Sequence, residues 1–153
     1  MFKHILIPTD GSELSNQAAR AGVGLAQALG ARVTGFFAAP APTPIVYSHF
    51  LPVGLTSPEE HAALIERTAA QYLSVIEEAA RAAGVPCQAL HETNDFPAEA
   101  ILETARRQGC DCIFMASHGH RKRRGTTLGS ETQKVAGASG VPVVIYRVEA
   151  AGG

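Results

Sequence analysis

Phosphate-binding chemistry is indicated most strongly by a glycine-rich segment, residues 116–130, which reads ASHGHRKRRGTTLGS. Gly119 and Gly129 carry no Cβ, so the backbone at either position can come close to a bound anion. Gly129 and Ser130 stand where a helix is expected to begin, and the free N–H groups of a helix N-terminus favour phosphate. The segment therefore predicts a phosphate site, although Ser130 and Gln133 also fit a capping box that requires no ligand.

A second candidate is Asp10, which lies in the sequence PTDGS at residues 8–12, just after an apolar run. A carboxylate at this place can accept a hydrogen bond from a ribose hydroxyl. It can also cap the helix that follows, whose first N–H groups lack partners. Position alone leaves both roles open, and the two roles are compatible.

Other patterns were weighed for different chemistry. The basic run at residues 121–124 fits a solvated loop, an electrostatic lid over a polyphosphate, or a nucleic-acid patch. A net charge of −1 and the lack of interleaved aromatic residues argue against nucleic acid. His118 and His120 have no further ligands near them in the sequence, so we expect no metal site. There is no Walker-type loop, no G-x-G-x-x-G after the first strand, and no recognisable catalytic set, so no catalytic residue is predicted.

These residues require a scaffold in which strands and helices alternate. Short runs rich in Val, Ile and Phe predict strands, and longer Ala-, Leu- and Glu-rich runs with helical periodicity predict helices. The expected strands are residues 3–8, 32–38, 86–92, 111–116 and 141–146, and the expected helices are residues 12–29, 57–83, 94–108 and 129–139. Such alternation is typical of a doubly wound α/β fold with a parallel sheet, in which ligands bind beyond the carboxyl ends of the strands.

Length and composition set the remaining expectations. A chain of 153 residues, 46% hydrophobic and 18% charged, predicts one domain over residues 1–147 with a disordered tail at 148–153. No apolar run is long enough to span a membrane, and the N-terminus does not resemble a signal peptide, so we expect a cytoplasmic protein with no membrane partner. The proline-rich residues 39–56 predict a long loop on the ligand side of the sheet. Three cysteines argue against a disulfide framework, and Cys110 and Cys112 are expected to be small buried side chains at the start of a strand.

The chain resembles the universal stress proteins of the UspA-like group over nearly its whole length. Residues 4–12 (HILIPTDGS), 97–102 (PAEAIL) and 113–146 carry the resemblance. The ATP-binding branch of this family has the motif G-x2-G-x9-G-[ST], and its spacing is intact here. Its positions are occupied by Ala116, Gly119, Gly129 and Ser130. Alanine at the first position weakens binding if the position needs φ > 0 or a bare backbone against the ligand, and is harmless if the residue only ends the strand.

The resemblance implies a Rossmann-like sheet of five strands in the order 3-2-1-4-5. It also implies an adenine nucleotide ligand (ATP, ADP or AMP, alone or with Mg²⁺). Asp10 would meet the ribose, Pro8 and the backbone of Ala38 would line the adenine near Met115, and the two glycines with Ser130 would hold phosphates. The full set of nucleotide-binding residues implied is Pro8, Thr9, Asp10, Ala38, Met115, Ala116, His118, Gly119, Gly129, Ser130, Glu131 and Thr132. The resemblance further implies a homodimer through the last strand, residues 141–145, whose apolar edge would otherwise be a liability.

These observations predict an ATP- or AMP-binding regulatory protein of the stress response, which acts through recognition by an unknown protein partner. It would not be a dedicated enzyme and would hydrolyse ATP slowly at most. Two alternatives remain open. One is a dimeric interaction module that binds no nucleotide, which Ala116 and the loop at 39–56 favour. The other is a slow ATPase that relies on a bound metal and the basic loop.

Overall fold

The computed structural model describes residues 1–41, 57–120 and 128–148. Most of the predicted loop at 39–56, the basic run at 121–124 and nearly all of the predicted tail lie outside these residues. The strands are β1 (His4–Pro8), β2 (Arg32–Ala39), β3 (Cys87–Thr93), β4 (Cys112–Ala116) and β5 (Val143–Tyr146). The helices are α1 (Glu13–Leu29), α3 (Pro58–Ala83), α4 (Pro97–Gln108) and α5 (Ser130–Ala138).

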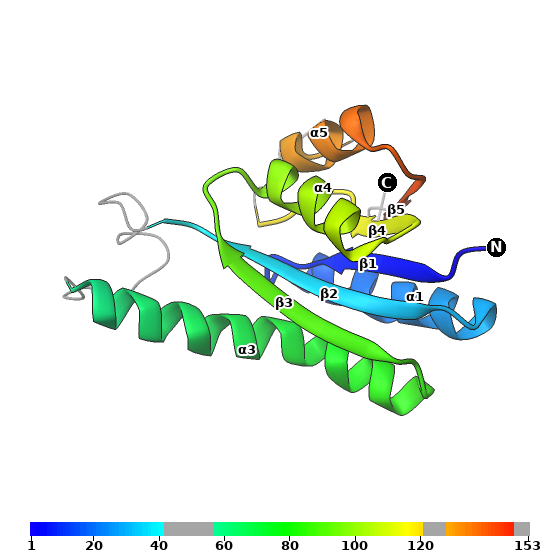
Figure 1. The fold of residues 1–153 in the computed structure, drawn as a ribbon, viewed down its shortest axis with the longest axis horizontal. Helices are drawn as coiled ribbons and strands as arrows, with labels where there is room; N and C mark the ends of the chain where they lie inside the picture. Colours follow the sequence, from blue (N-terminus) through cyan, green and yellow to red (C-terminus); the bar gives the residue numbers. More distant parts are fainter. Residues whose placement is uncertain (42–56, 121–127, 149–153) are drawn as a thin grey trace.

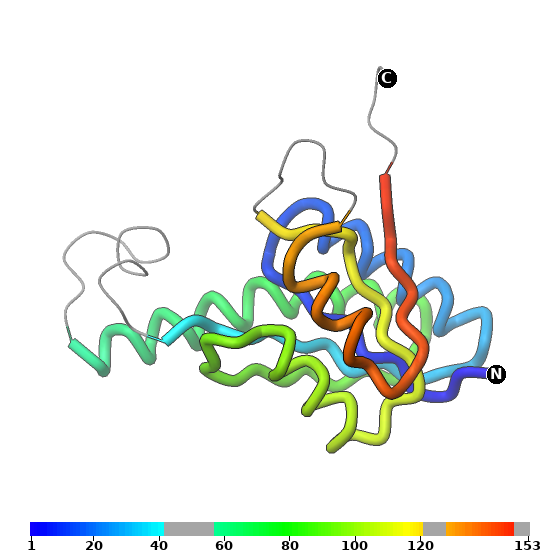
Figure 2. The backbone as a smooth tube through the Cα atoms, turned by 90° about the horizontal axis from the view of Figure 1, so that it is seen from above, coloured from blue at the N-terminus to red at the C-terminus, as the bar shows by residue number. Residues whose placement is uncertain are grey.

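The strands form one parallel sheet in the order β3-β2-β1-β4-β5 (Figure 1). The doubly wound α/β fold and the implied strand order are therefore confirmed. Strands β2 and β3 lie on one side of β1, and the later strands β4 and β5 lie on its other side. Seen from above, β5 (red) runs beside β4 (yellow) at the edge of the sheet (Figure 2).

Helices cover both faces of the sheet (Figure 1). Alternate residues of a strand point to opposite faces, so Ile5 and Ile7 of β1 pack into the core beneath α1 and α3. Leu6, between them, packs into the second core beneath α4 and α5. All three side chains are fully buried. This two-sided burial explains why the central strands read as continuous apolar runs rather than alternating ones.

The predicted ends of the first two helices are confirmed by their capping groups. Ser12 accepts a hydrogen bond from the N–H of Ser15 at 3.2 Å, and Ser57 accepts one from the N–H of Glu60 at 3.0 Å. Helices α1, α3 and α4 each end at a glycine whose backbone lies in the left-handed region. These C-cap glycines are Gly30, Gly84 and Gly109.

Some predicted boundaries are wrong by a few residues. The helix expected from residue 94 begins at Pro97, because Asn94 accepts a hydrogen bond from the N–H of Phe96 and holds these residues in a turn. The strand expected from residue 141 begins at Val143. The N–H of Val141 donates to the hydroxyl of Ser139 instead of entering the sheet.

Helix α1 approaches the sheet closely at Gly22, which is buried. A Cβ added there would lie 2.8 Å from Cδ1 of Ile7 and 2.9 Å from Cδ1 of Phe114. Gly24, two residues later on the same helix, has no atom within 4 Å of an added Cβ. The hydrogen side chain of Gly22 therefore permits the close contact between α1 and the sheet.

The three cysteines are free thiols, as predicted. Cys112 is fully buried and Cys110 is nearly so. Burial raises the pKa of each of these two thiols to about 11. None of the described helices combines the length and the apolar character that a membrane span requires.

Candidate functional site

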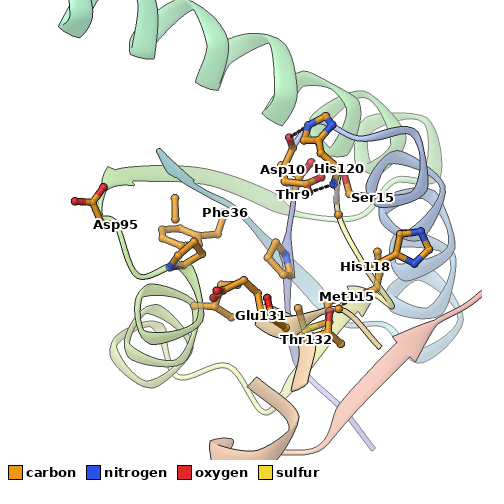
Figure 3. A pocket seen from close by; sticks show the side chains of 18 residues that line it. Thr9, Asp10, Ser15, Phe36, Asp95, Met115, His118, His120, Glu131 and Thr132 are labelled. Carbon is orange, nitrogen blue, oxygen red and sulfur yellow. Dashed lines mark hydrogen bonds between the residues drawn. The ribbon is translucent and has the colours of Figure 1, made fainter. Parts of the chain in front are cut away.

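A cavity of about 470 Å³ opens beyond the carboxyl ends of β1, β2 and β4 (Figure 3). This is the place where the strand order reverses, and where doubly wound folds bind ligands. All twelve nucleotide-binding residues implied by the resemblance line this cavity. Six further residues line it that were not among them: Ser15, Phe36, Asp95, Pro97, Ile101 and His120.

One wall of the cavity is apolar and carries free backbone groups at Ala38. The ladder between β1 and β2 ends at the pair Pro8 and Phe36, where the N–H of Thr9 donates to the Phe36 carbonyl at 2.9 Å. Backbone groups two residues apart on a strand point to the same side, so the N–H and C=O of Ala38 face the side that β1 has left. In the described part of the chain, no hydrogen bond is made by either group. Ala38 therefore offers one donor and one acceptor to the cavity.

Asp10 holds together two segments that border the cavity. Its Oδ1 accepts a hydrogen bond from the N–H of Ser12 at 2.9 Å, and its Oδ2 accepts one from the N–H of His120 at 3.1 Å. The ring of His120 donates from Nε2 to the Asp10 carbonyl at 2.7 Å. Figure 3 shows these bonds between Asp10 and His120. A carboxylate offers about four acceptor sites, so about two remain for a ligand.

The glycines of the motif provide space rather than an unusual backbone angle. Neither Gly119 nor Gly129 is among the described glycines with positive φ. A Cβ on Gly119 would lie 1.8 Å from Oδ2 of Asp10, and one on Gly129 would lie 3.1 Å from Cα of His118. Gly119 therefore lets the backbone pass directly over the Asp10 carboxylate.

Ala116 ends strand β4, where it pairs with Tyr146 of β5. No described residue other than glycine has positive φ, so this position does not require a left-handed backbone. The Ala116 carbonyl accepts a hydrogen bond at 3.0 Å from the hydroxyl of Thr132, which is buried. The backbone at Ala116 is therefore not left-handed, but Ala116 also lines the cavity, so the effect of its methyl group on ligand binding stays a prediction.

The capping box considered for α5 is wrong. Gly129 is the N-cap and Ser130 is the first residue of the helix, and the N-cap makes no side-chain hydrogen bond. Gln133 donates from Nε2 to the Leu128 carbonyl at 2.9 Å instead of closing the box. A local pattern could not show this, because glycine also accepts the extended backbone of an N-cap. Among the described residues, no side chain caps the first N–H groups of α5, which border the cavity.

Glu131 connects the first turns of two helices. Its Oε2 accepts a hydrogen bond at 2.9 Å from the N–H of Ala98, the second residue of α4. Its Oε1 accepts one from Nζ of Lys134 at 3.2 Å. The N-cap of α4 is Phe96, which makes no side-chain cap hydrogen bond. Glu131, on another helix, therefore caps α4 in its place.

The residues that sequence reasoning missed reach the cavity mainly through tertiary contacts. Asp95 is held by a hydrogen bond from the N–H of Ala41 to its Oδ1 at 2.8 Å, across a long separation in the chain. His120 was not among the predicted binding residues, although its position beside Gly119 was a usable signal. Phe36 lies two residues before Ala38 on the same strand, so period-two alternation could have found it. Among the described residues, no cluster of three or more His, Cys, Asp or Glu side chains could hold a metal.

Fold and cavity together define a doubly wound α/β protein with a ligand-sized cavity at its switch point. The family model described as the universal stress protein family matches residues 1–147, so the chain belongs to that family. It is 34% identical over 148 residues to a universal stress protein of Thermus aquaticus, a match that covers 96% of this chain and 100% of the relative.

Solved structures share the fold. Hypothetical protein MJ0577 matches with a TM-score of 0.80 and 24% identity over 99% of both chains. A universal stress protein solved in complex with cAMP matches with a TM-score of 0.67 and 19% identity, covering 95% of this chain and 97% of its own. One from Archaeoglobus fulgidus, solved in complex with dAMP, matches with a TM-score of 0.62 and 17% identity, covering 96% of this chain and 98% of its own.

Proposed function

We propose that this protein binds an adenine nucleotide in the cavity and serves as a regulatory protein of the stress response. The observation that supports this most strongly is the composition of the cavity. One wall is apolar and carries Ala38, whose N–H and C=O make no hydrogen bond to another described residue, and the lining also includes the N-terminus of α5, whose N-cap Gly129 makes no side-chain cap hydrogen bond. A volume of about 470 Å³ lies within the ordinary range of small-molecule sites.

Each part of a nucleotide has a matching group in this proposal. The base would lie between Pro8 and Met115, with its hydrogen-bonding edge against the N–H and C=O of Ala38. Adenine presents an acceptor beside an amino donor on that edge, which complements the two backbone groups. The ribose would use the remaining acceptor sites of Asp10. The phosphate would meet Ser130 and the first N–H groups of α5.

The relatives support the nature of the ligand. Two members of the fold group were solved in complex with cAMP and with dAMP, both of which contain adenine. By analogy we assign the same base to this chain, with AMP, ADP or ATP as the nucleotide, alone or with Mg²⁺. Any hydrolysis of ATP would be slow.

The proposed regulator acts as a homodimer and through a partner protein. β5 pairs with β4 on one side, and its side chains are only partly buried. A second copy that pairs along the other side would cover this edge. Sedimentation or light scattering tests the dimer independently of nucleotide binding.

Isothermal titration of the purified protein with AMP and ATP tests the site. Gly119→Ala forces a methyl group onto the Asp10 carboxylate, where a Cβ would lie 1.8 Å from Oδ2. We expect this variant to lose about tenfold or more in affinity, because Asp10 or the backbone must move. Gly24→Ala is the matched control, since no atom lies within 4 Å of its added Cβ. If no adenine nucleotide binds to the unaltered protein at millimolar concentration, the proposal is wrong.

A further inference from the structure

We propose that Tyr72 is a positioning residue that holds Asp10 where a nucleotide can bind it. This inference rests on the proposed function, and it concerns a side chain that lies outside the cavity lining. Tyr72 belongs to α3, which covers the sheet on the face opposite to α4 and α5 (Figure 1). It would act on Asp10 from behind the site, through the backbone.

The ring of Tyr72 lies directly against Gly11, the residue that follows Asp10. A Cβ added at Gly11 would collide with the Cζ, Cε1 and Cε2 carbons of this ring, which are its three nearest atoms. The backbone at Gly11 also has φ of +80°, in the left-handed region that other residues disfavour. Glycine is therefore required twice at this position, for the turn of the backbone and for the close approach of the ring.

The same ring is fixed against β2. Tyr72 meets Phe37 edge to face, with ring centroids 5.1 Å apart and ring planes inclined at 77°. Phe37 is buried in the core beneath α1 and α3, and the next residue, Ala38, lines the cavity. Because Phe37 is packed in the core of the sheet, the ring of Tyr72 has a rigid support. The turn at Gly11 is thus held at a fixed place relative to β2.

The phenol group of Tyr72 lies close enough to Asp10 to be affected by its charge. Burial raises the pKa of Tyr72, and the negative charge of Asp10 raises it further. The Asp10 carboxylate accepts hydrogen bonds from Ser12 within the same turn and from His120 beyond β4. These bonds orient the carboxylate on its turn, and the ring of Tyr72 supports the turn itself. The acceptor atoms that the ligand would use consequently depend on Tyr72 for their position.

Two substitutions separate the carboxylate from its support. A hydrogen bond to a charged group is worth about tenfold or more in a binding constant, so Asp10→Ala should weaken AMP binding by at least that factor. Tyr72→Ala keeps the carboxylate and removes its support, and the displaced carboxylate should weaken AMP binding by about fivefold. Tyr72→Phe keeps the three ring carbons that contact Gly11 and should bind AMP as the unaltered protein does.

Titration calorimetry with AMP on Tyr72→Ala, Asp10→Ala and the double variant closes a thermodynamic cycle between the two residues. If Tyr72 acts through Asp10, Tyr72→Ala should change the affinity by less than about twofold in the Asp10→Ala background. Leu73→Ala is the matched control. It truncates the next side chain of α3, which is buried in the core and provides none of the three atoms nearest to Gly11. Leu73→Ala should therefore destabilise the protein while leaving the AMP affinity of the folded protein unchanged.

Amide hydrogen exchange, followed by NMR without nucleotide, reads the position of Asp10 directly. The N–H groups of Ser12 and His120 donate to its two carboxylate oxygens. Relative to the amides of the central strands, both should exchange about fivefold faster in Tyr72→Ala, because the turn opens more often. In Tyr72→Phe and in Leu73→Ala they should exchange at the rate of the unaltered protein, again relative to the central strands.

An equal loss of AMP affinity from Tyr72→Ala in both backgrounds overturns the inference, because the ring would then act independently of Asp10. An equal loss in Leu73→Ala also overturns it, since general destabilisation would explain the effect. Unchanged exchange at Ser12 and His120 in Tyr72→Ala overturns it as well, and all three results leave the proposed function intact. If the unaltered protein binds no adenine nucleotide, the proposed function fails, and the exchange rates alone decide whether Tyr72 positions Asp10.

Discussion

Replacing Gly22 by alanine should destabilise the protein, although alanine is the better helix former. In the interior of α1 the exchange of glycine for alanine gains about 1 kcal/mol of helix propensity. At Gly22, however, the new methyl carbon would lie 2.8 Å from Ile7 and 2.9 Å from Phe114, well inside van der Waals contact. Both partners are core side chains of the sheet, and overfilling a packed core costs about 1–3 kcal/mol. We therefore expect a net loss of up to about 2 kcal/mol in the free energy of unfolding.

Gly24→Ala is the internal reference for this measurement. It gives the same gain in propensity on the same helix, and no atom lies within 4 Å of the added methyl carbon. It should therefore stabilise the protein by about 1 kcal/mol. For a domain of this size each kcal/mol corresponds to about 2–4 °C in Tm. Urea denaturation and thermal melting of both variants measure the difference. Equal stabilisation by the two substitutions would refute the close packing of α1 on the sheet.

Three other properties can be predicted from buried groups. Burial lowers the pKa of His4, and the nearby positive charge of Arg32 lowers it further. As the pH falls below about 6.5, the ordinary pKa of histidine, the unfolded chain therefore binds more protons than the native protein. The contribution of neutral His4 to the free energy of unfolding is therefore complete above that pH and is lost as the pH falls. Urea melts should show the free energy of unfolding decreasing as the pH drops to 5.5, and the decrease should be smaller in His4→Gln. The pKa values of about 11 for Cys110 and Cys112 predict that neither thiol reacts with a disulfide reagent at pH 8 until the protein unfolds; rapid modification of the native protein would contradict this. Thr132→Val removes the buried hydrogen bond to the Ala116 carbonyl and should cost about 1–3 kcal/mol in denaturant melts, whereas an unchanged midpoint would show that the bond contributes nothing.

Local patterns predicted the elements of this fold better than their arrangement. Serine and glycine caps are local signals, so the ends of α1 and α3 could be predicted from a few adjacent residues. Strand order depends on pairings between segments far apart in the chain, for which periodicity carries no information. The order of the sheet came from the family resemblance, and the register of the strands confirmed it.

The candidate site shows the same limit at the level of single side chains. The segment around Gly119 and Gly129 could be found because its residue types are unusual for their position. Asp95 could not, because the N–H of Ala41 places it at the cavity. Glu131 was found by resemblance, but its contact with Ala98 on another helix is a product of tertiary packing.

The position of β1 has a consequence for synthesis on the ribosome. One edge of β1 pairs with β2, the next strand in the chain. The other edge pairs with β4, which is made much later, and there Ile5 pairs with Cys112. During translation, a nascent chain therefore exposes one edge of a strand that is fully buried in the native fold until about a hundred further residues have been made. Such edges recruit other strands. The emerging protein should accordingly be most vulnerable to misassembly, and most dependent on chaperones, just before β4 leaves the exit tunnel.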